Sequence, residues 1–460
     1  MTAVEHTRTG APAARDAHGD RSPAAAPPAL VALFAAMILY ATFGKGFAYA
    51  GWPPVFVGEV LLLVVVVAAA QRGLVFPRTP LAALTALIAG VALVQFAIER
   101  TEPAVPLQET VRGVAPVVYA AFAFAGYSLL RGYERVAGAT TILTAIDRGS
   151  TRALPYMVVA LAAIAGLAFI DPALPTWPGS GAPLFFKKGA DLAVGLVIVL
   201  PFVMARRDVT RRVLPSWALP AVWWFSVLVA TRSRGAVLAI LVGALVMRPN
   251  GVRLARVGFV IATIVLLLYV SGLTITMQRR EVSYDAMTDA AASVLGGKAD
   301  EEIGGGYVGT AEWRTRWWSD IWDDVTAHDM YLAGHGWGDN MAVRYGVVPA
   351  SAADDPRVLR LPHNILFSLA GRAGLVVAIA FIAVPVLTIA RTFRTGGPTP
   401  LPVQAARGAL AAAVAAGMVD VHLESPQGGI LLWSLTGFLW WATAARLPEP
   451  GDVGPQAAVG

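Results

Sequence analysis

The sequence predicts an all-α membrane protein with about 12 transmembrane helices and one large loop outside the cytoplasm. Three observations predict this fold class: the composition is strongly apolar, the apolar residues gather in long runs, and Arg residues lie between these runs in a regular order. Hydrophobic residues make up 56% of the 460 residues and charged residues 14%, with a mean hydropathy of +0.61. A soluble domain is typically about 25% charged, so the composition argues against a water-soluble fold.

The apolar runs are long enough to cross a hydrocarbon core of about 30 Å. The run at 235–248 is the shortest, and only the residues from Thr231 to Arg234 separate it from the run before, so these two can form a tight hairpin. The first run is long enough to span and is therefore expected to be retained as a helix. The runs lie at 29–46, 56–71, 80–98, 110–130, 153–170, 188–205, 215–230, 235–248, 254–273, 363–390, 404–421 and 428–445.

The Arg residues predict the orientation of these helices. With the N-terminus inside, every short inner loop carries Arg, whereas the short outer loops carry acidic residues, which is the bias expected of cytoplasmic and outer loops. Both termini are therefore expected in the cytoplasm. The predicted parts are a disordered cytoplasmic tail at 1–27, nine helices within 28–273, an extracytoplasmic loop at 274–361, three helices within 362–446 and a cytoplasmic tail at 447–460.

The loop at 274–361 is expected to fold without covalent support, since the chain has no cysteine for a disulfide or a thiolate metal site. Its Trp-rich segment 313–322 predicts an amphipathic helix at the membrane interface, where Trp is enriched. Residues 334–338, Gly-His-Gly-Trp-Gly, predict a sharp turn. The glycines at 304–306 follow no predicted strand, so a nucleotide-binding loop is not supported.

Basic side chains on the outer side are the main candidates for chemistry. A charge beside a membrane helix is costly unless it lies at the interface or faces a polar cavity. Arginine forks suit pyrophosphate because they bind phosphate oxygens through paired, charge-assisted hydrogen bonds. The alternative is that these side chains extend to lipid headgroups. The candidates are Arg232 and Arg234 in the predicted hairpin, Arg314 and Arg316 on the Trp-rich helix, and His363 with Asn364 after Pro362.

His363 has two interpretations from the residues alone. A histidine has an unperturbed pKa near 6.5, which suits a general base. A lone histidine at a helix start is also a common cap or satisfied polar contact, and the pattern does not separate the two.

Other polar residues are weaker candidates. His328 and His335, with Asp329 and Asp339 nearby, allow but do not require a metal site, and no metal is expected. For Lys187 and Lys188 we favour an interfacial anchor over a second phosphate contact. The last outer turn carries three further polar residues, which are expected to be solvated: Asp420, His422 and Glu424.

The order of these motifs resembles the O-antigen ligase and O-antigen polymerase superfamily. Arg234 is followed by Leu238 in the family's arginine, three residues, leucine pattern, and Arg314 lies four residues before Trp318. The Gly334–Gly338 motif comes next, and His363-Asn364 is followed after nine residues by Gly374. The sequence departs from the family pattern at Asp191, where an Asn is expected.

This resemblance implies an inverting, metal-independent glycosyltransferase of class C in the bacterial inner membrane. It would transfer a glycan from a polyprenyl, undecaprenyl-type pyrophosphate to an acceptor hydroxyl during polysaccharide biosynthesis in the cell envelope. In that hypothesis Arg234 and Arg314 bind the pyrophosphate, with Arg232 and Arg316 beside them, and His363 is the base or orients the acceptor. Asn364, Trp318 and Gly336 would support the site.

The implied partners are the lipid-linked donor, a glycan or lipid acceptor and the bilayer; no cofactor and no nucleic acid are expected. Ligase and polymerase activity stay open alternatives, as does the choice between Arg314 and Arg316. The rival hypothesis is a transporter or flippase whose outer arginines recruit an anionic lipid-linked glycan.

Overall fold

The computed structural model describes residues 28–52, 55–101, 107–167, 175–178, 184–185, 188–205, 218–230, 233–247, 275–277, 280–282, 301–349, 351, 361–394 and 399–445. Side chains are described for these residues except 219–220, 234, 275–277, 280–282 and 301–312. The predicted tails at 1–27 and 447–460 and the predicted span at 254–273 lie outside the described residues.

The described part of the chain is helical apart from two short antiparallel hairpins, β1 with β2 and β3 with β4, so the all-α class is confirmed. The N-terminal elements are α1 (Pro28–Phe43), α2 (Lys45–Ala48), β1 (Gly51–Trp52), β2 (Val55–Phe56), α3 (Val57–Gln71), α4 (Pro80–Glu99), α5 (Leu107–Val118), α6 (Ala121–Ala137), α7 (Ala139–Leu167), α8 (Gly189–Ala205), α10 (Ala218–Ala230) and α11 (Arg234–Val246). The C-terminal elements are β3 (Ile275–Met277), β4 (Arg280–Val282), α14 (Glu301–Ala327), α15 (Met341–Arg344), α16 (Ile365–Ala373), α17 (Leu375–Thr392), α18 (Leu401–Gly417), the 3₁₀ helix η3 (Val421–Glu424) and α19 (Pro426–Ala444).

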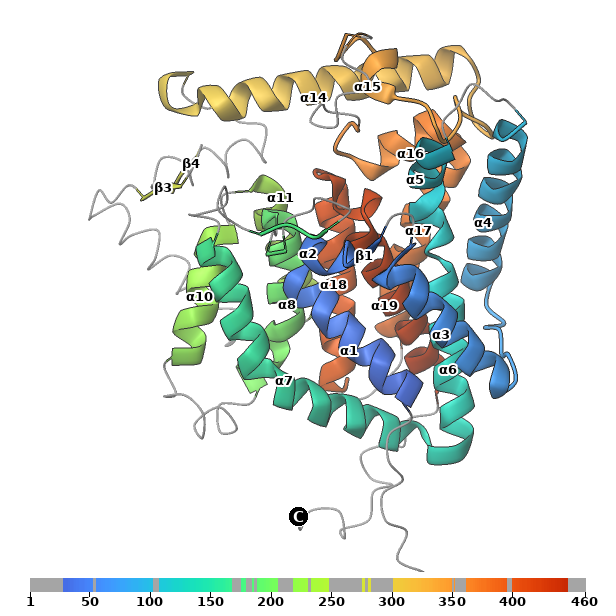
Figure 1. Ribbon diagram of the computed structural model, residues 1–460, viewed down its shortest axis with the longest axis vertical. Coiled ribbons are helices and arrows are strands. Elements are labelled where there is room, and N and C mark those ends of the chain that lie inside the picture. Colours follow the sequence, from blue (N-terminus) through green and yellow to red (C-terminus); the bar gives the residue numbers. More distant parts are fainter. Residues whose placement is uncertain are drawn as a thin grey trace, which may run out of the picture.

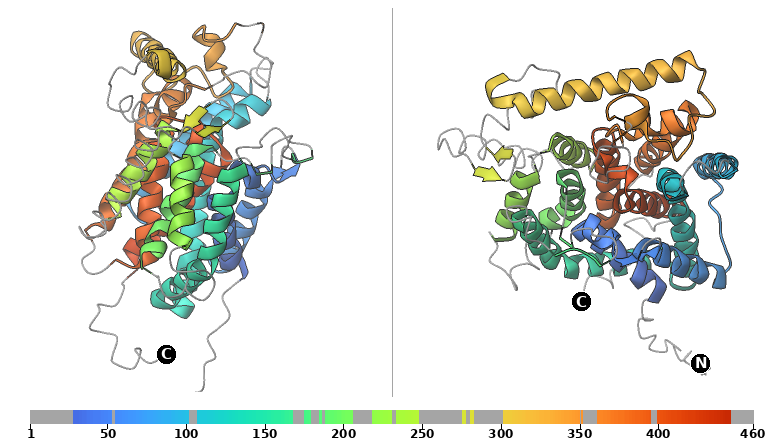
Figure 2. Two further views of the ribbon diagram at one scale, coloured as in Figure 1. Left: turned by 90° about the vertical axis from the view of Figure 1, so that its left-hand side faces the viewer. Right: turned by 45° about the horizontal axis from the view of Figure 1, so that its top comes forward.

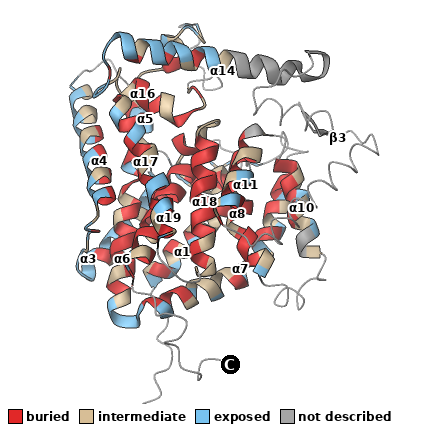
Figure 3. Ribbon diagram, turned by 180° about the vertical axis from the view of Figure 1, so that it is seen from behind, coloured by how far each residue is buried: buried red, intermediate tan, exposed pale blue. Residues whose placement is uncertain are grey.

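The helices form a bundle around α18 and α19, and α14 lies across one end of it (Figure 1). We call this the α14 end. The two further views show the same placement of α14 over the ends of the bundle helices (Figure 2). Burial follows this arrangement, because α8, α18 and α19 are almost wholly buried while α4 exposes much of its surface (Figure 3). Exposed apolar side chains on α3 and α4, such as Leu63 and Leu87, suit contact with lipid.

Small residues allow the central helices to approach closely. α18 is rich in Ala and packs against both α8 and α11. A Cβ atom on Gly243 of α11 would lie 2.9 Å from the backbone oxygen of Gly408 on α18, so no larger residue fits there without a shift. Close backbone approach through small residues is the usual basis of helix packing within a membrane.

Three described helices are long and apolar enough to cross a membrane: α4, α7 and α17. The pair α5 and α6 makes a fourth candidate if the two helices, bent by 41° at their junction, count as one span. Five shorter apolar segments add to these within the described residues: Pro28–Phe43, Val57–Gln71, Gly189–Ala205, Ala221–Ala230 and Gly235–Val246. The chain is a membrane protein by these helices, and the count of twelve spans stays a prediction.

Three of the expected apolar runs differ from the observed helices. The run at 110–130 is divided between α5 and α6, and Pro116 lies just before the bend, where its missing N–H weakens the helix ladder. The run at 363–390 is divided by Gly374, whose φ of 98° ends α16 and starts α17. The helix expected from 153 begins earlier, at Ala139, because the polar segment before Leu154 continues the same helix.

The segment after α14 is fastened to the start of α17 by backbone hydrogen bonds. Leu375 N donates to Met330 O (3.2 Å) and Val376 N to Tyr331 O (2.9 Å). His335 N and Gly336 N donate to the last carbonyls of α16, those of Gly371 and Arg372. The first two contacts satisfy N–H groups at the start of α17 that have no partner within that helix, and the other two satisfy carbonyl oxygens near the end of α16.

The end of the bundle opposite α14 carries several of the predicted inner-loop arginines. Arg72 lies over the ring of Tyr133 at 4.0 Å, which joins the end of α3 to α6. Arg131 pairs with Glu134 at 2.6 Å and donates to the carbonyl of Ala444 at the end of α19. These predicted inner-loop arginines therefore lie at the end away from α14, which the positive-inside bias would make the cytoplasmic side.

This distribution predicts that α14 lies outside the cytoplasm and the end of α19 inside. A reporter that is active only outside the cytoplasm is expected to be active when fused near Ala299 and inactive when fused near Pro448. The measurement is reporter activity per amount of fusion protein in whole cells. Activity at the second position, or none at the first, would contradict the orientation.

Candidate functional site

Five elements meet at the α14 end and carry the candidate site: the first turn of α8, the start of α11, the connection from α18 to η3, the start of α16 and the inner face of α14. α8 and α11 adjoin there, since a Cβ on Gly189 would lie 2.6 Å from Cβ of Ser233. α11 also adjoins the connection, because a Cβ on Gly235 would lie 3.7 Å from Cβ of Asp420. The elements are far apart in the chain, so the fold brings them together.

Arg314 and His363 form the centre of this group. Nη2 of Arg314 lies 3.4 Å from Nδ1 of His363, and Nη1 donates to the carbonyl oxygen of Val419 at 3.3 Å. The ring of Trp313 meets His363 edge to face, with centroids 6.2 Å apart, and the Arg314 guanidinium lies 5.4 Å from the Trp313 ring centroid. His363 has a φ of 58°, an uncommon conformation for a non-glycine residue, of the kind that recurs at functional sites.

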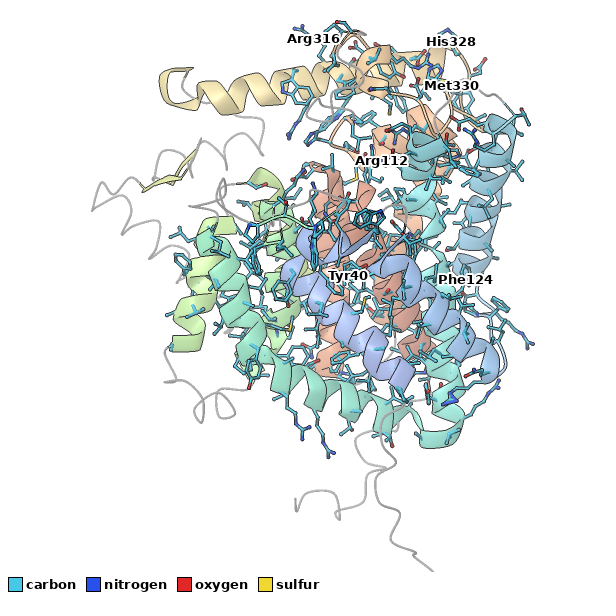
Figure 4. All side chains as sticks on the ribbon, viewed as in Figure 1. Tyr40, Arg112, Phe124, Arg316, His328 and Met330 are labelled. Carbon is cyan, nitrogen blue, oxygen red and sulfur yellow. The ribbon has the colours of Figure 1, made fainter. Side chains whose placement is uncertain are left out.

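Arg314 and Arg316 point in different directions. Residues two apart on an α-helix lie about 200° apart around its axis, so only one of the pair can face the bundle. Trp317 and Ile321 are fully buried on the face that also carries Arg314. Arg316 is exposed, and Figure 4 shows it on the side of α14 away from the bundle.

Asp420 and Lys188 complete the group. Oδ1 of Asp420 lies 3.7 Å from Nδ1 of His363 and 3.8 Å from Nζ of Lys188. Asp420 also accepts a hydrogen bond from the backbone N–H of Val421 at 2.7 Å. The expectation of a solvated Asp420 is therefore wrong, because its carboxylate is largely buried beside the imidazole and faces the Lys188 ammonium. The interfacial-anchor interpretation of Lys188, whose side chain is 35% exposed, stays a prediction.

The pKa values of His363 and Asp420 shift because of this arrangement. Burial lowers the pKa of His363, Arg314 and Lys188 lower it further, and the Asp420 carboxylate opposes them. The imidazole is therefore neutral at neutral pH. Burial alone would raise the pKa of Asp420, but its contact with His363 and the charge of Lys188 hold that pKa well below its usual value.

A second group of polar side chains lies buried beside the first, deeper in the bundle, and includes Asp191 and His422. Oδ1 of Asp191, in the first turn of α8, lies 2.6 Å from Nδ1 of His422, and their side chains are 3% and 2% exposed. Gln427 donates to the other oxygen of Asp191 at 3.5 Å. Ser368 donates to Glu424 at 3.2 Å, and burial raises the pKa of Glu424 to about 7. His422 and Glu424 are thus part of the core, which corrects the expectation that they are solvated.

These contacts hold the α18–η3 connection at two points. Lys188 and Asp191 are three residues apart and lie at the beginning of α8, so they share one face of that turn. Lys188 contacts Asp420, and Asp191 contacts His422 two residues further on. The first turn of α8 therefore fixes the residues on both sides of Val421, and with them the carboxylate beside His363.

The remaining predicted site residues have varied places. Arg232 and Lys187 lie outside the described residues. Arg234 is the first residue of α11, beside the α18–η3 connection, and its side chain is outside the described part. Trp318 lies near His363, because its Nε1 donates to the carbonyl oxygen of Pro362 at 2.7 Å and its ring stacks on Phe367.

Asn364 and Gly336 have structural contacts. Oδ1 of Asn364 accepts the N–H of Leu366 at 2.9 Å and so caps α16. Gly336 has a φ of 105° within the predicted turn at 334–338. The carboxylate of Glu99 accepts the next two backbone N–H groups, those of Trp337 and Gly338, at 2.7 and 2.8 Å. This turn therefore docks on the end of α4.

The two loop histidines share one carboxylate. Nε2 of His335 lies 2.6 Å from Oδ2 of Asp324, and Nδ1 of His328 lies 2.8 Å from Oδ1 of the same residue. The hydroxyl of Tyr345 also donates to Asp324, at 2.7 Å. Among the residues whose side chains are described, no group of three or more His, Cys, Asp or Glu side chains has the arrangement of a metal site.

Lys188, Asp191, Asp420 and His422 contribute to the site more than the sequence pattern indicates. The available signal was that two charged residues begin α8 and that two titratable residues follow α18, at predicted helix ends on the same side of the bundle. The periodicity of a sequence does not reveal which helix ends lie side by side, so these ion pairs could be identified only from the three-dimensional structure.

A bundle of apolar helices with Arg, His, Lys and Asp gathered at one end defines a class: an integral membrane protein with a polar site at the ends of its helices. Residues 219–382 match the family described as O-antigen ligase, and the resemblance to O-antigen ligases and polymerases is confirmed over this part of the chain. The match contains Arg234, Arg314 and His363. No curated protein matches the chain significantly.

The buried Asp191–His422 pair predicts a large effect on stability. Asp191→Ala is expected to lower the free energy of unfolding by about 3–5 kcal/mol, because removing one partner leaves the other buried without it. Asp191→Asn is expected to cost less than half as much, since its carbonyl oxygen still accepts the Nδ1–H of His422. Thermal or denaturant unfolding of the purified protein in detergent measures both, and a stability of Asp191→Ala equal to that of the original protein would contradict the role of the pair.

Proposed function

We propose that the protein transfers a glycan from a polyprenyl, undecaprenyl-type pyrophosphate to an acceptor hydroxyl, as an O-antigen ligase or polysaccharide polymerase. The family match indicates glycan transfer of this type at a coarse level. The single observation that carries the finer proposal is the contact of Arg314 with His363 at the α14 end, with Asp420 and Lys188 beside them. A guanidinium beside a neutral, partly buried imidazole would supply a contact for the leaving pyrophosphate and a base for the acceptor hydroxyl.

His363 would accept the proton of the attacking hydroxyl. The donor's anomeric carbon gains a bond to the acceptor oxygen and loses its bond to the pyrophosphate oxygen, which inverts the configuration at that carbon. The low pKa of His363 keeps the imidazole in its unprotonated, basic form at neutral pH. After transfer the proton resides on the imidazolium, beside the Asp420 carboxylate.

The position of the histidine proton depends on Arg314 and Asp420, since both lie next to Nδ1. While Arg314 donates to Nδ1, the ring proton must be on Nε2, which then cannot act as a base. If Arg314 turns to a bound pyrophosphate, Nδ1 can carry the ring proton and direct this N–H toward the Asp420 carboxylate. Nε2 is then unprotonated and can accept the proton of the acceptor hydroxyl. Donor binding would thus prepare the base.

Arg314 would stabilise the leaving group. Negative charge grows on the polyprenyl pyrophosphate as the glycosidic bond breaks, and a guanidinium that contacts it in a partly buried site stabilises such charge strongly. Arg234, at the start of α11, and Arg232 just before it are proposed as further contacts to the pyrophosphate. No step in this scheme requires a metal ion.

The direct test is reconstitution of the purified protein in liposomes with a polyprenyl-pyrophosphate oligosaccharide and candidate acceptors. Release of free polyprenyl pyrophosphate together with a lengthened acceptor is the expected result, with EDTA present or absent. Movement of intact donor across the bilayer without release would favour the transporter or flippase hypothesis. Loss of release with EDTA and recovery with a divalent ion would contradict the metal-independent scheme.

Arg314 and Arg316 form a matched pair for this assay. Arg314→Ala is expected to lower turnover per folded molecule by about 100-fold to 1,000-fold, the usual effect of removing one donor to a developing negative charge. Arg314→Lys should be nearly as severe, because an ammonium cannot form the paired hydrogen bonds of a guanidinium. Arg316→Ala is the control and should retain activity. Equal activity of the two alanine variants would refute the proposed role.

The pH dependence of transfer tests His363 and its neighbours. Since the native pKa of His363 is lowered, activity should persist as pH falls and be lost only below about 6.5, the usual histidine value. Lys188→Met removes a cation that lowers this pKa, so the acid limb should move to higher pH. Asp420→Asn removes the carboxylate that raises it, so the limb should move to lower pH. His363→Gln should abolish turnover with the protein still folded.

The measurement is turnover against pH at saturating donor, with donor affinity recorded separately. Shifts of the acid limb in the same direction for the Lys188 and Asp420 variants would contradict the assignment of that limb to His363. Normal turnover of His363→Gln would leave this residue as a cap before α16.

A further inference from the structure

A cavity of about 140 Å³ lies inside the bundle, between α1, α6, α7, α8, α18 and α19. Large apolar side chains such as Leu33, Leu154 and Phe202 form much of its wall. Among the lining residues, the only side chains with a hydroxyl are Ser150 and Ser434, and none carries a charge. The residues of the catalytic proposal do not line it.

The cavity is separate from the candidate site along the helix axes. Phe202 is 11 residues beyond Asp191 on α8, which places it about 16 Å further from the α14 end at 1.5 Å per residue. Ser434 is seven residues beyond Gln427 on α19, a displacement of about 10 Å. The cavity therefore lies at the depth of the apolar helices, where the surrounding medium is lipid.

Around the cavity, small residues leave empty space instead of allowing two helices to approach closely. Gly126 illustrates this, because a Cβ there would meet only Cδ2 of Leu33, at an ordinary contact distance of 3.9 Å. Gly437 is the contrast, since a Cβ on it would lie 2.3 Å from the backbone oxygen of Ala123. Larger residues would fill the cavity at several lining positions that are small: Ala41, Gly126, Ser150, Ala405, Ala406 and Ser434.

The hydroxyl of Ser434 is a small polar feature in the otherwise apolar wall of the cavity, and it makes Ser434 a position where a larger apolar residue can be introduced. Ser434 is 8% exposed, and its Oγ has no hydrogen-bond partner. Hydroxyls on the same helix follow the usual pattern, since Thr436 donates to the carbonyl of Leu432 at 2.8 Å and Thr443 to that of Leu439 at 2.9 Å. Ser434 thus differs from its neighbours at the point where α19 faces the cavity.

We infer that this cavity holds a segment of the hydrocarbon chain of a membrane lipid. An apolar cavity of this size excludes water and takes up small apolar groups; the standard example, of about 150 Å³, binds benzene. The volume therefore fits a short stretch of chain and not a whole lipid. Phe34, Met37 and Ile146 line the cavity but are only half-buried, so the cavity lies close to the surface where α1 and α7 adjoin, and the rest of the chain would have to leave there.

Photo-crosslinking tests this inference without any measurement of glycan transfer, so its failure is distinguishable from failure of the proposed function. The full chain is reconstituted with a phospholipid that carries a diazirine near the end of its acyl chain, or with a diazirine-labelled polyprenol. Labelled peptides are mapped by mass spectrometry. Labelling is expected in the facing segments of α1, α18 and α19, and the two probes show whether an acyl or an isoprenoid chain occupies the cavity.

Ser434→Leu should fill the cavity and lower labelling of these segments about tenfold, which corresponds to lost contact with about two methylene groups. Gly126→Val is a second filling variant, and Ala35→Leu, on the exposed face of α1, is the matched control that should label as the original protein does. Absence of labelling in the original protein, or equal labelling in the folded filling variants, would overturn the inference.

Discussion

The buried contact between Asp191 and His422 is the interaction on which the site depends. It joins the first turn of α8 to the connection between α18 and α19, in a region where neither side chain reaches water. An ionisable side chain in such a place is stable only with a partner, so the position of each residue defines the position of the other. Asp420 is two residues from His422, and the same turn of α8 holds it through Lys188. The geometry around His363 is therefore set by a contact that the reacting groups do not make.

The groups of the site are held in two different ways. His363 lies in a short turn with a positive φ, and the next residue, Asn364, caps α16. Asp420 is held by the N–H of Val421 and by Lys188. Arg314 instead extends from a helix across the end of the bundle and contacts one backbone oxygen and the imidazole. A base on a rigid support and a long cationic side chain able to change partners suit a reaction in which a large anionic donor must enter, react and leave as pyrophosphate.

Much of the fold and part of the site could be predicted from the sequence. The apolar runs predicted helices at nearly every described position, since a helix in lipid must satisfy its own backbone groups and its sequence records this directly. The breaks at Gly374 and before Ala121 were missed, because an apolar run does not show where a helix bends. Arg314 and His363 stood out, since charge is rare in such a chain. Asp191 and His422 did not, because their importance comes from which helix ends adjoin, and no local pattern encodes that.

The backbone hydrogen bonds between residues 330–331 and the start of α17 have a consequence for how this protein tolerates sequence change. Main-chain atoms make these contacts, and those of residues 335 and 336, so exposed side chains such as Tyr331 and Leu332 can vary while α14 keeps its position over the bundle. Gly334 and Gly336 are exceptions, because a Cβ on Gly334 would lie 2.4 Å from the backbone oxygen of Gly371 and Gly336 has a φ of 105°. Insertions and deletions are a different matter. One residue added or removed within α14 between Trp317 and Ala327 would rotate the preceding part of the helix by about 100° about its axis and turn Arg314 away from His363. Sequence drift in this segment should therefore proceed by substitution at constant length.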